Sequence, residues 1–368
     1  MEMSITMSGQ PQVAVTGKPK SNDTLLPVLR VIPSQCYERS NRKAFALVAR
    51  SVGLWVITVA GLAATNTWYL LAPLWLLASL AVSGLFVLGH DCAHGALFES
   101  KHLNRRIGRV LMVPSLHIFE AWVVGHNRIH HGHTLRQGMD FVWHPSTVGD
   151  FAAMNPLQRL RHRFEWSAVG SGAYYLRSIW WQKMIRFTAP QRYRVAVRKD
   201  RQFLATAVGL LITVAMSTTL VLGGGVADAG WNLVKLFVVP FVGFCCSIGS
   251  IVYVHHIAPD IKWWPRRTWN SFHGQVEGTT ALQVPKVINA LFLFNIMVHV
   301  PHHVDVRIPC YELQRASDAI IAAFPEVDHR PMRLADFMRS TRVCKLYDFE
   351  RQIWLNYRGE AASAVDVK

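Results

Sequence analysis

Four long apolar stretches constrain this chain more than any other feature of its sequence. They cover about residues 45–65, 68–89, 203–223 and 231–254, and Arg50 and Lys235 are the basic residues within or beside them. An α-helix needs about 20 mostly apolar residues to cross a bilayer. Because helices satisfy their own backbone hydrogen bonds in lipid, each stretch is predicted to be a membrane-spanning helix. The fold class expected is an all-α integral membrane protein.

Short turns join the first stretch to the second and the third to the fourth. The turns predict two helical hairpins, each of which begins and ends on the same side of the membrane. Residues 1–44 contain six Lys and Arg, 100–202 contain 17 and 254–368 contain 14, whereas the two turns contain none. Positively charged loops stay in the cytoplasm, so both termini and the central segment are predicted to be cytoplasmic. We expect a multi-pass protein of a bacterial inner membrane or an equivalent membrane.

The rest of the chain is predicted to form a cytoplasmic helical cap and a tail at each end. Residues 1–40 begin with a polar segment that lacks the apolar core of a signal peptide, and we expect a disordered cytoplasmic tail there. Residues 41–330 are expected to hold the four spans and the cap, followed by a cytoplasmic tail over 331–368. Segments 105–125 and 284–300 are apolar but interrupted or short, so they are predicted to be helices lying at the membrane surface.

The formal net charge of +16 indicates anionic partners, which could be nucleic acid, lipid or acidic protein. The basic residues lie in the predicted cytoplasmic segments, which favours attraction to anionic lipid. No zinc-finger, basic-zipper or RNA-recognition pattern accompanies them, and nucleic acid is therefore not expected as a partner. The six cysteines show no C-x-x-C spacing, which argues against a cysteine zinc site and a disulfide framework.

Three clusters of histidine lie at the predicted cytoplasmic ends of the membrane elements. Their spacings are H-x-x-x-H, H-x-x-x-H-H and H-x-x-H-H. Residues three or four positions apart share a helix face, so each cluster could direct two or three imidazoles at one point. Eight separately buried histidines would need eight separate hydrogen-bonding partners in an apolar region, which favours a shared metal site. The eight residues are His90, His94, His126, His130, His131, His299, His302 and His303.

The number of imidazoles indicates more than one metal ion. Neutral imidazole binds zinc, copper, iron and nickel. Zinc takes about four ligands, and an octahedral ion takes about six, so eight or nine imidazoles match two irons with positions left for oxygen. Other histidines lack such spacing, and structural or surface roles are expected for them: His102, His117, His144, His162, His273 and His329.

The histidine clusters resemble a known set of motifs. "GHDCAH", "HNRIHH" and "HVPHH" resemble the three histidine boxes of the membrane fatty acid desaturase family. "YVHHIAPDIKWWP" and "HVPHHVDVRIPCYELQRA" are similar to segments of the plastid and cyanobacterial omega-6 (delta-12) acyl-lipid desaturases. The resemblance covers about residues 45–320 and indicates an O2-dependent oxidoreductase that introduces a cis double bond into an acyl chain.

The resemblance also implies cofactors, partners and one further ligand. The family implies two iron ions that cycle between Fe2+ and Fe3+, held by the eight histidines and by a ninth just after the last span. His256 best matches that position, and the neighbouring His255 is the competing choice. His133 lies beyond the second box and is not required. The substrate implied is an acyl chain on a membrane lipid or a carrier.

The electron donor is expected to be a separate small protein such as ferredoxin or cytochrome b5. The sequence has no H-P-G-G haem motif, no G-x-G-x-x-G nucleotide fingerprint and no cysteine set for an iron–sulfur cluster. Arg159, Arg161 and Arg163 could steer an acidic carrier or bind lipid headgroups.

Two other classes of function remain open at this point. Hydroxylases, acetylenases and ketolases use histidine boxes on the same scaffold. A histidine-rich metal transporter is the more remote alternative. Transporters place ionisable ligands near the middle of the bilayer, whereas the four apolar stretches contain no Asp, Glu or His before their inner ends.

Overall fold

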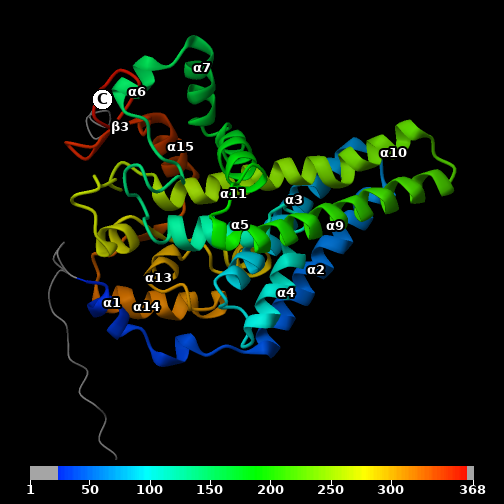
Figure 1. Ribbon diagram of the computed structural model, residues 1–368, viewed down its shortest axis with the longest axis horizontal. Helices are drawn as coiled ribbons and strands as arrows, with labels where there is room; N and C mark the ends of the chain where they lie inside the picture. Colours follow the sequence, from blue (N-terminus) through cyan, green and yellow to red (C-terminus); the bar gives the residue numbers. More distant parts are fainter. Residues whose placement is uncertain (1–23, 363–368) are drawn as a thin grey trace, which may run out of the picture.

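The computed structural model describes residues 24–362 and is mostly helical (Figure 1). Within this part of the chain, four helical segments are long and apolar enough to cross a membrane: Asn41–Ala64, Trp68–Ala93, Gln191–Val221 and Val226–His256. They confirm the four predicted spans and lengthen each of them. The first two are α2 and α3, and α9 (Arg194–Val221) makes up most of the third. The fourth joins α10 (Val226–Leu233), a π-helix (Val234–Val238) and α11 (Val239–His256).

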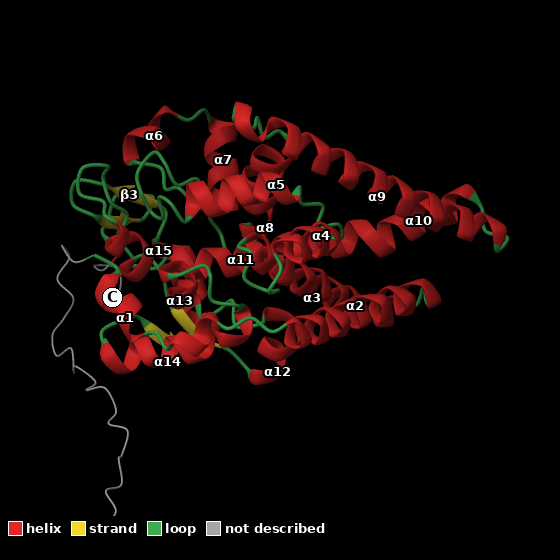
Figure 2. Ribbon diagram, turned by 60° about the horizontal axis from the view of Figure 1, so that its bottom comes forward, coloured by secondary structure: helices red, strands yellow, loops and turns green. Residues whose placement is uncertain are grey.

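The spans pack mainly through α3. Helix α3 contacts both α2 and α11, while α9 packs along α10. The second half of α3 is buried from Ala78 onward except for Leu80, whereas Val197 and Leu204 are the only buried apolar side chains of α9. Figures 1 and 2 show α9 and α10 projecting beyond the rest of the molecule. An apolar helix without a protein partner on most of its surface is suited to a lipid environment.

A buried lysine connects two of the spans at their ends away from the histidines. Lys235 is 1% exposed, and its ammonium donates to the carbonyl of Thr65 at 3.0 Å and to Asn66 Oδ1 at 2.9 Å. The indole of Trp231 donates to the same Asn66 oxygen at 3.0 Å. These contacts satisfy the charged group with oxygen acceptors and attach the end of α2 to the fourth span.

The remaining elements surround the C-terminal ends of α3 and α11. The helices are α1 (Leu26–Val31), α4 (Lys101–Leu111), α5 (Phe119–Trp122), α6 (Val148–Ala153), α7 (Pro156–Glu165), α8 (Ser171–Tyr174), α12 (Lys286–Ile288), α13 (His299–Val304), α14 (Leu313–Ala323) and α15 (Leu334–Val343). Further π-helices cover Val123–His130, Tyr175–Ile185, His273–Glu277 and Asn289–Leu293, and short 3-10 helices cover Ser34–Tyr37, Gln191–Tyr193 and Cys310–Glu312. Strands β1 (Ala281–Gln283) and β2 (His329–Pro331) pair in parallel, and β3 (Leu346–Asp348) and β4 (Ile353–Leu355) pair antiparallel.

The chain preceding α2 is folded over residues 24–40, where the sequence had predicted a disordered tail. Helix α1 and the following 3-10 helix pack against α14. Val28 of α1, Ile32 just after it and Cys36 of the 3-10 helix are buried there. The expectation of a tail over residues 1–23 lies outside the described part of the chain.

The chain after residue 330 also differs from the predicted tail. Helix α15 and the β3–β4 pair cover the segment that follows α11. The indole of Trp354 donates to the carbonyl of Ile261 at 2.8 Å, and the hydroxyl of Tyr347 donates to the carbonyl of Trp263 at 3.1 Å. Two large aromatic side chains therefore fix residues 331–362 to the body of the protein, and residues 363–368 lie outside the described part.

The segment 284–300 forms three pieces, in contrast to the single surface helix expected from its composition. Phe294 and Asn295 adopt left-handed backbone conformations with φ of 47° and 62°. Asn289 Oδ1 accepts from the Asn295 amide at 2.8 Å and stabilises this turn. The break ends the π-helix at Leu293 and lets a new helix, α13, begin at His299.

Candidate metal centre

The eight clustered histidines and His256 meet at the C-terminal ends of α3 and α11. Five of them, which we call the first group, have ligand atoms within 4.8 Å of one another. Helix α3 and the residue that caps it provide two, the π-helix over 123–130 and its following residue provide two, and α13 provides one. The members are His90, His94, His126, His131 and His302.

A second group lies beside the first. Ring nitrogens of His130, His256 and His303 lie within 4.8 Å of one another. His299 adjoins them, with its Nε2 atom 3.0 Å from Nε2 of His303, and we include it in the second group. The rings of His131 and His303 stack with centroids 4.2 Å apart, so the two groups are in direct contact.

The π-helix explains how one histidine box serves both groups. An α-helix would turn residues five positions apart away from each other, whereas a π-helix has i to i+5 hydrogen bonds. The amide of His131 donates to the carbonyl of His126 at 3.0 Å, which is such a bond. This wider turn keeps His126 and His131 together in the first group and directs His130 to the second.

Each imidazole of the second group donates its Nδ1 proton to an oxygen that can only accept. His130 bonds the Asp140 carboxylate at 3.0 Å, His256 bonds the carbonyl of Gly278 at 3.0 Å and His299 bonds the carbonyl of Ile296 at 3.2 Å. His303 bonds Gln275 Oε1 at 2.8 Å. The Gln275 amide nitrogen donates to the carbonyl of His131, which fixes the orientation of that amide.

These bonds place unprotonated nitrogens against one another. A neutral imidazole that carries its proton on Nδ1 has a lone pair on Nε2. The Nε2 atoms of His299 and His303 are 3.0 Å apart, so two lone pairs face each other in a buried site. A cation between them would turn this repulsion into coordination. The donor set therefore fits a metal, and neutral imidazole suits iron among the first-row metals.

The first group shows the same convergence of ring nitrogens. Nε2 of His126 lies 2.8 Å from Nε2 of His90 and 3.0 Å from Nε2 of His131. Two nitrogens bound at right angles to one ion, each about 2.1 Å from it, would be about 3.0 Å apart. The spacing of these rings thus matches neighbouring ligands of an octahedral ion.

Burial keeps these imidazoles neutral. Loss of solvent, followed by the neighbouring imidazoles, holds the pKa values of His131, His302 and His303 well below the usual histidine range. A metal needs the neutral form of the ring. These three rings are therefore available to a metal ion at physiological pH without first losing protons.

Other residues singled out in the sequence lie outside the two groups. His255 is 1% exposed, has no hydrogen-bond partner among residues 24–362 at either ring nitrogen and stacks on His299 with centroids 3.8 Å apart. His133 bonds Arg136 at 3.1 Å. The carboxylate of Asp91, which follows His90 in the first box, accepts from the Cys310 amide at 3.0 Å.

Asp140 and Gln275 belong to the site but were not identified from the sequence. Asp140 is 1% exposed and Gln275 is 5% exposed, and each bonds a ring of the second group. Asp140 lies only ten residues after His130, so the sequence could have indicated it as a carboxylate partner for that ring. Gln275 is separated from both His131 and His303 along the chain, and only the fold brings it to them.

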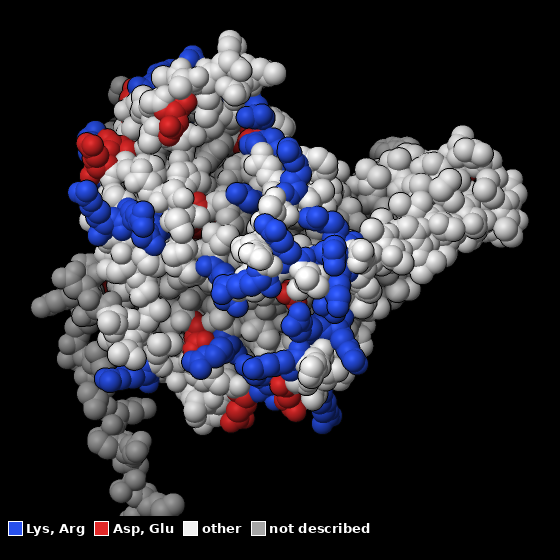
Figure 3. Space-filling view, in the orientation of Figure 1, with Lys and Arg blue, Asp and Glu red and all other residues white. Residues whose placement is uncertain are grey.

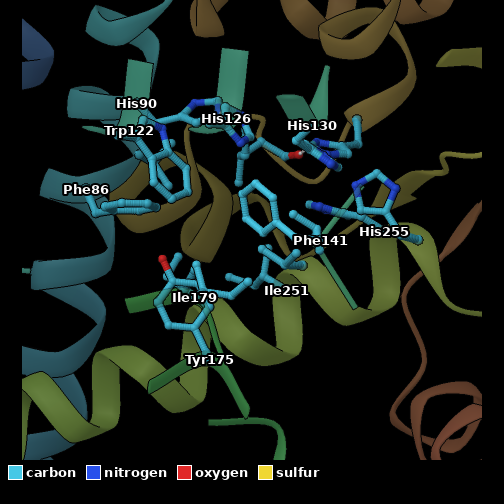
Figure 4. Close-up of a pocket in the computed structure, with 17 residues that line it drawn as sticks. Phe86, His90, Trp122, His126, His130, Phe141, Tyr175, Ile179, Ile251 and His255 are labelled. Atoms are coloured by element: carbon cyan, nitrogen blue, oxygen red, sulfur yellow. Dashed lines mark hydrogen bonds between the residues drawn. The ribbon is translucent and has the colours of Figure 1, made fainter. Parts of the chain in front are cut away.

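An apolar cavity of about 50 Å³ adjoins the imidazoles. Figure 4 shows His90, His126, His130 and His255 along one side, with Tyr175 at the opposite end. The other labelled residues that line the cavity are Phe86, Trp122, Phe141, Ile179 and Ile251.

The far end of the cavity has a fixed polar pair. His117 Nδ1 donates to the carbonyl of Ser115 at 2.7 Å, so its Nε2 accepts from the Tyr175 hydroxyl at 3.0 Å. Burial lowers the pKa of His117 to about 3, which keeps this arrangement neutral. The Tyr175 hydroxyl is thereby held by His117, and the cavity wall is largely hydrocarbon.

Positive charge gathers on the face seen in Figure 3. Lys and Arg lie over α4 and the start of α9, while the projecting ends of α9 and α10 carry none on this face. Exposed members include Lys101, Arg105, Arg106, Arg194, Arg198 and Lys199. On α7, Arg159, Arg161 and Arg163 are also exposed. Both regions could attract acidic proteins or anionic headgroups.

Comparisons with known proteins agree with the chemistry of this centre. The model of the family described as fatty acid desaturase matches residues 66–334. The chain is 28% identical over 338 residues to an sn-1 oleoyl-lipid 12-desaturase of Anabaena variabilis, covering 88% of this chain and 89% of that protein. It is 30% identical over 338 residues to a chloroplastic omega-6 fatty acid desaturase of Arabidopsis thaliana, covering 89% of this chain and 70% of that protein. A Synechocystis sn-1 oleoyl-lipid 12-desaturase is 27% identical over 339 residues, with coverage of 90% and 92%.

Proposed function

Because the chain belongs to the fatty acid desaturase family and desaturates fatty acyl chains, we propose that two irons bound by nine histidines serve this reaction. The first group would hold one iron, and the second group, with His256 and His299, would hold the other. The facing lone pairs of His299 and His303 are the observation that carries the proposal. Bound there, the irons would activate O2 for the removal of two hydrogens.

The substrate proposed is an oleoyl chain on a membrane lipid, with a new cis double bond at position 12. The similar cyanobacterial proteins are named for this substrate and position. In this chain the apolar cavity lies directly against the imidazoles, so a methylene segment held there would be close to the centre and shielded from water. The Tyr175 and His117 pair closes the far end and would limit how deeply a chain enters.

The overall reaction needs electrons from outside this chain. One O2, two electrons and two protons, together with two hydrogens from the acyl chain, give two waters and one double bond. We propose a small acidic carrier such as ferredoxin or cytochrome b5 as the donor. The exposed basic residues on α4, α7 and the start of α9 support this choice, since opposite charge speeds the encounter of two proteins.

We also propose that the four spans form two hairpins beneath a cytoplasmic cap in a bacterial inner membrane or an equivalent membrane. The inner ends of α3 and α11, where the histidines lie, would then face the cytoplasm with both termini. Support comes from the 17 Lys and Arg in residues 100–202 and from the absence of any in the two turns.

Expression in a host that contains oleoyl lipids and reduced ferredoxin tests the proposal. Gas chromatography–mass spectrometry of the lipids should show a second double bond at position 12, and His302→Ala should abolish it. A new bond at another position would refute the regiochemistry. Hydroxylated or acetylenic products without a second double bond would overturn desaturation in favour of a related oxidation.

A further inference from the structure

The two groups of histidines differ in how their rings are held. All four rings of the second group donate Nδ1 to a protein oxygen, at distances from 2.8 to 3.2 Å. In the first group, Nδ1 of four of the five rings lacks a hydrogen-bond partner among the described residues. These are His90, His94, His131 and His302.

Asp140 adds a buried carboxylate to the second group, and this increases the difference between the two groups. Its carboxylate accepts from the amides of Leu135 at 2.9 Å and Val142 at 3.0 Å and from His130 Nδ1 at 3.0 Å. The loop after the second histidine box therefore holds a buried negative charge against one ring of the second group. A carboxylate in this position orients an imidazole and increases its basicity, and such partners typically contribute about 10- to 100-fold to metal affinity.

The first group is also more accessible to solvent than the second. His94 of the first group is only half-buried, whereas His130, His256, His299 and His303 are all buried. The first group is thus both less restrained by hydrogen bonds and closer to solvent. Each difference favours faster exchange of an ion from the first group.

We propose that the two metal positions are inequivalent: the second group forms a restrained, tightly binding position, and the first group forms an exchangeable one. Asp140 is the main positioning residue for the tight position, acting through His130, and Gln275 assists through His303. The inference rests on the proposed di-iron function, but it concerns how each ion is held.

Iron release from the purified wild-type protein tests the inequivalence. The protein is loaded with ferrous iron without oxygen, and release to ferrozine is followed by absorbance. Two phases of about equal amplitude are expected, with rate constants at least about tenfold apart. A single phase that releases two irons would refute inequivalence and leave the di-iron function intact. Loading of one iron or none would contradict the di-iron function itself.

Two variants assign each phase of iron release to one group of histidines. Asp140→Asn should accelerate the slow phase by about 10- to 100-fold and leave the fast phase unchanged. His302→Ala should remove the fast phase and keep the slow one. Asp150→Asn, which makes the same change at an exposed helix cap, is the matched control and should release iron as the wild type does.

Mössbauer spectra add a readout that general loosening of the fold would not mimic. After the fast iron is removed and replaced with 57Fe, the wild type should show one quadrupole doublet, and protein fully loaded with 57Fe whose fast iron is then replaced with 56Fe should show a different one. This measurement decides the question even where Asp140→Asn does not fold. Identical doublets from both positions, or a slow phase insensitive to a folded Asp140→Asn variant, would overturn the assignment.

Discussion

Neighbouring histidines at the end of α11 are predicted to respond oppositely to the same substitution. His255→Phe and His256→Phe each replace a buried imidazole with a buried phenyl ring. His256 contributes a ring nitrogen to the second group and donates to the Gly278 carbonyl at 3.0 Å. His255 lies outside both groups and has no hydrogen-bond partner at either nitrogen within the described part of the chain, while its ring stacks on His299.

The contacts of each ring determine the expected changes in stability and iron content. In His256→Phe the Gly278 carbonyl loses its donor, which costs about 1–3 kcal/mol in a buried site. One of four proposed ligands of the tight position is also lost, so iron content should fall from two to about one per chain. In His255→Phe a phenyl ring can keep the stacking contact and removes two unpaired polar atoms, each of which costs about 1–3 kcal/mol. Allowing for the larger ring, stability should be unchanged or higher by about 1 kcal/mol.

The assay combines thermal unfolding in detergent of the iron-free proteins with iron analysis of the loaded ones. The expected pattern is a lower midpoint and one iron for His256→Phe, against an unchanged or higher midpoint and two irons for His255→Phe. The reverse pattern, with iron lost only from His255→Phe, would refute the assignment of His256 as the ninth ligand.

Three further predictions concern the cavity, the packing of α11 and pH. Ile179→Phe should reduce desaturation of an 18-carbon chain by about 10-fold or more with iron content unchanged, as product analysis and metal analysis of one preparation would show. Gly249→Ala should lower the unfolding free energy by about 1–3 kcal/mol in denaturant titrations, because the added Cβ would lie 2.5 Å from the Ser171 carbonyl oxygen; unchanged stability would contradict the close α8–α11 packing. Burial lowers the pKa of Lys345 to about 8, below its usual 10.5, so the unfolded chain holds this proton at higher pH than the folded one. Thermal stability of the wild type should therefore rise from pH 8 to 10 relative to Lys345→Met, and a fall would contradict the burial of a neutral amine.

Features that depend on local sequence were predictable. Each span is marked by its own run of apolar residues, and the spans in the structure differ from the predicted ones mainly by extra residues at one or both ends. The histidine clusters were equally visible because their spacing is short, as in His299, His302 and His303 on α13.

Features that depend on distant contacts could not be predicted. Gln275 reaches His303 only after the π-helix over 273–277 packs on α13. The left-handed turn at Phe294 and Asn295 relies on the side chain of Asn289, and composition alone made that segment resemble a continuous helix. The wide turn that separates His130 from His131 leaves no clear mark in the sequence.

Binding of two irons by nine histidines is measurable as the metal content of the purified, iron-loaded protein. Mass-spectrometric metal analysis, referred to protein concentration from amino-acid analysis, should find two irons per chain in the wild type and about one in His302→Ala. One iron or none in an active wild-type preparation, or two irons retained in His302→Ala, would contradict it.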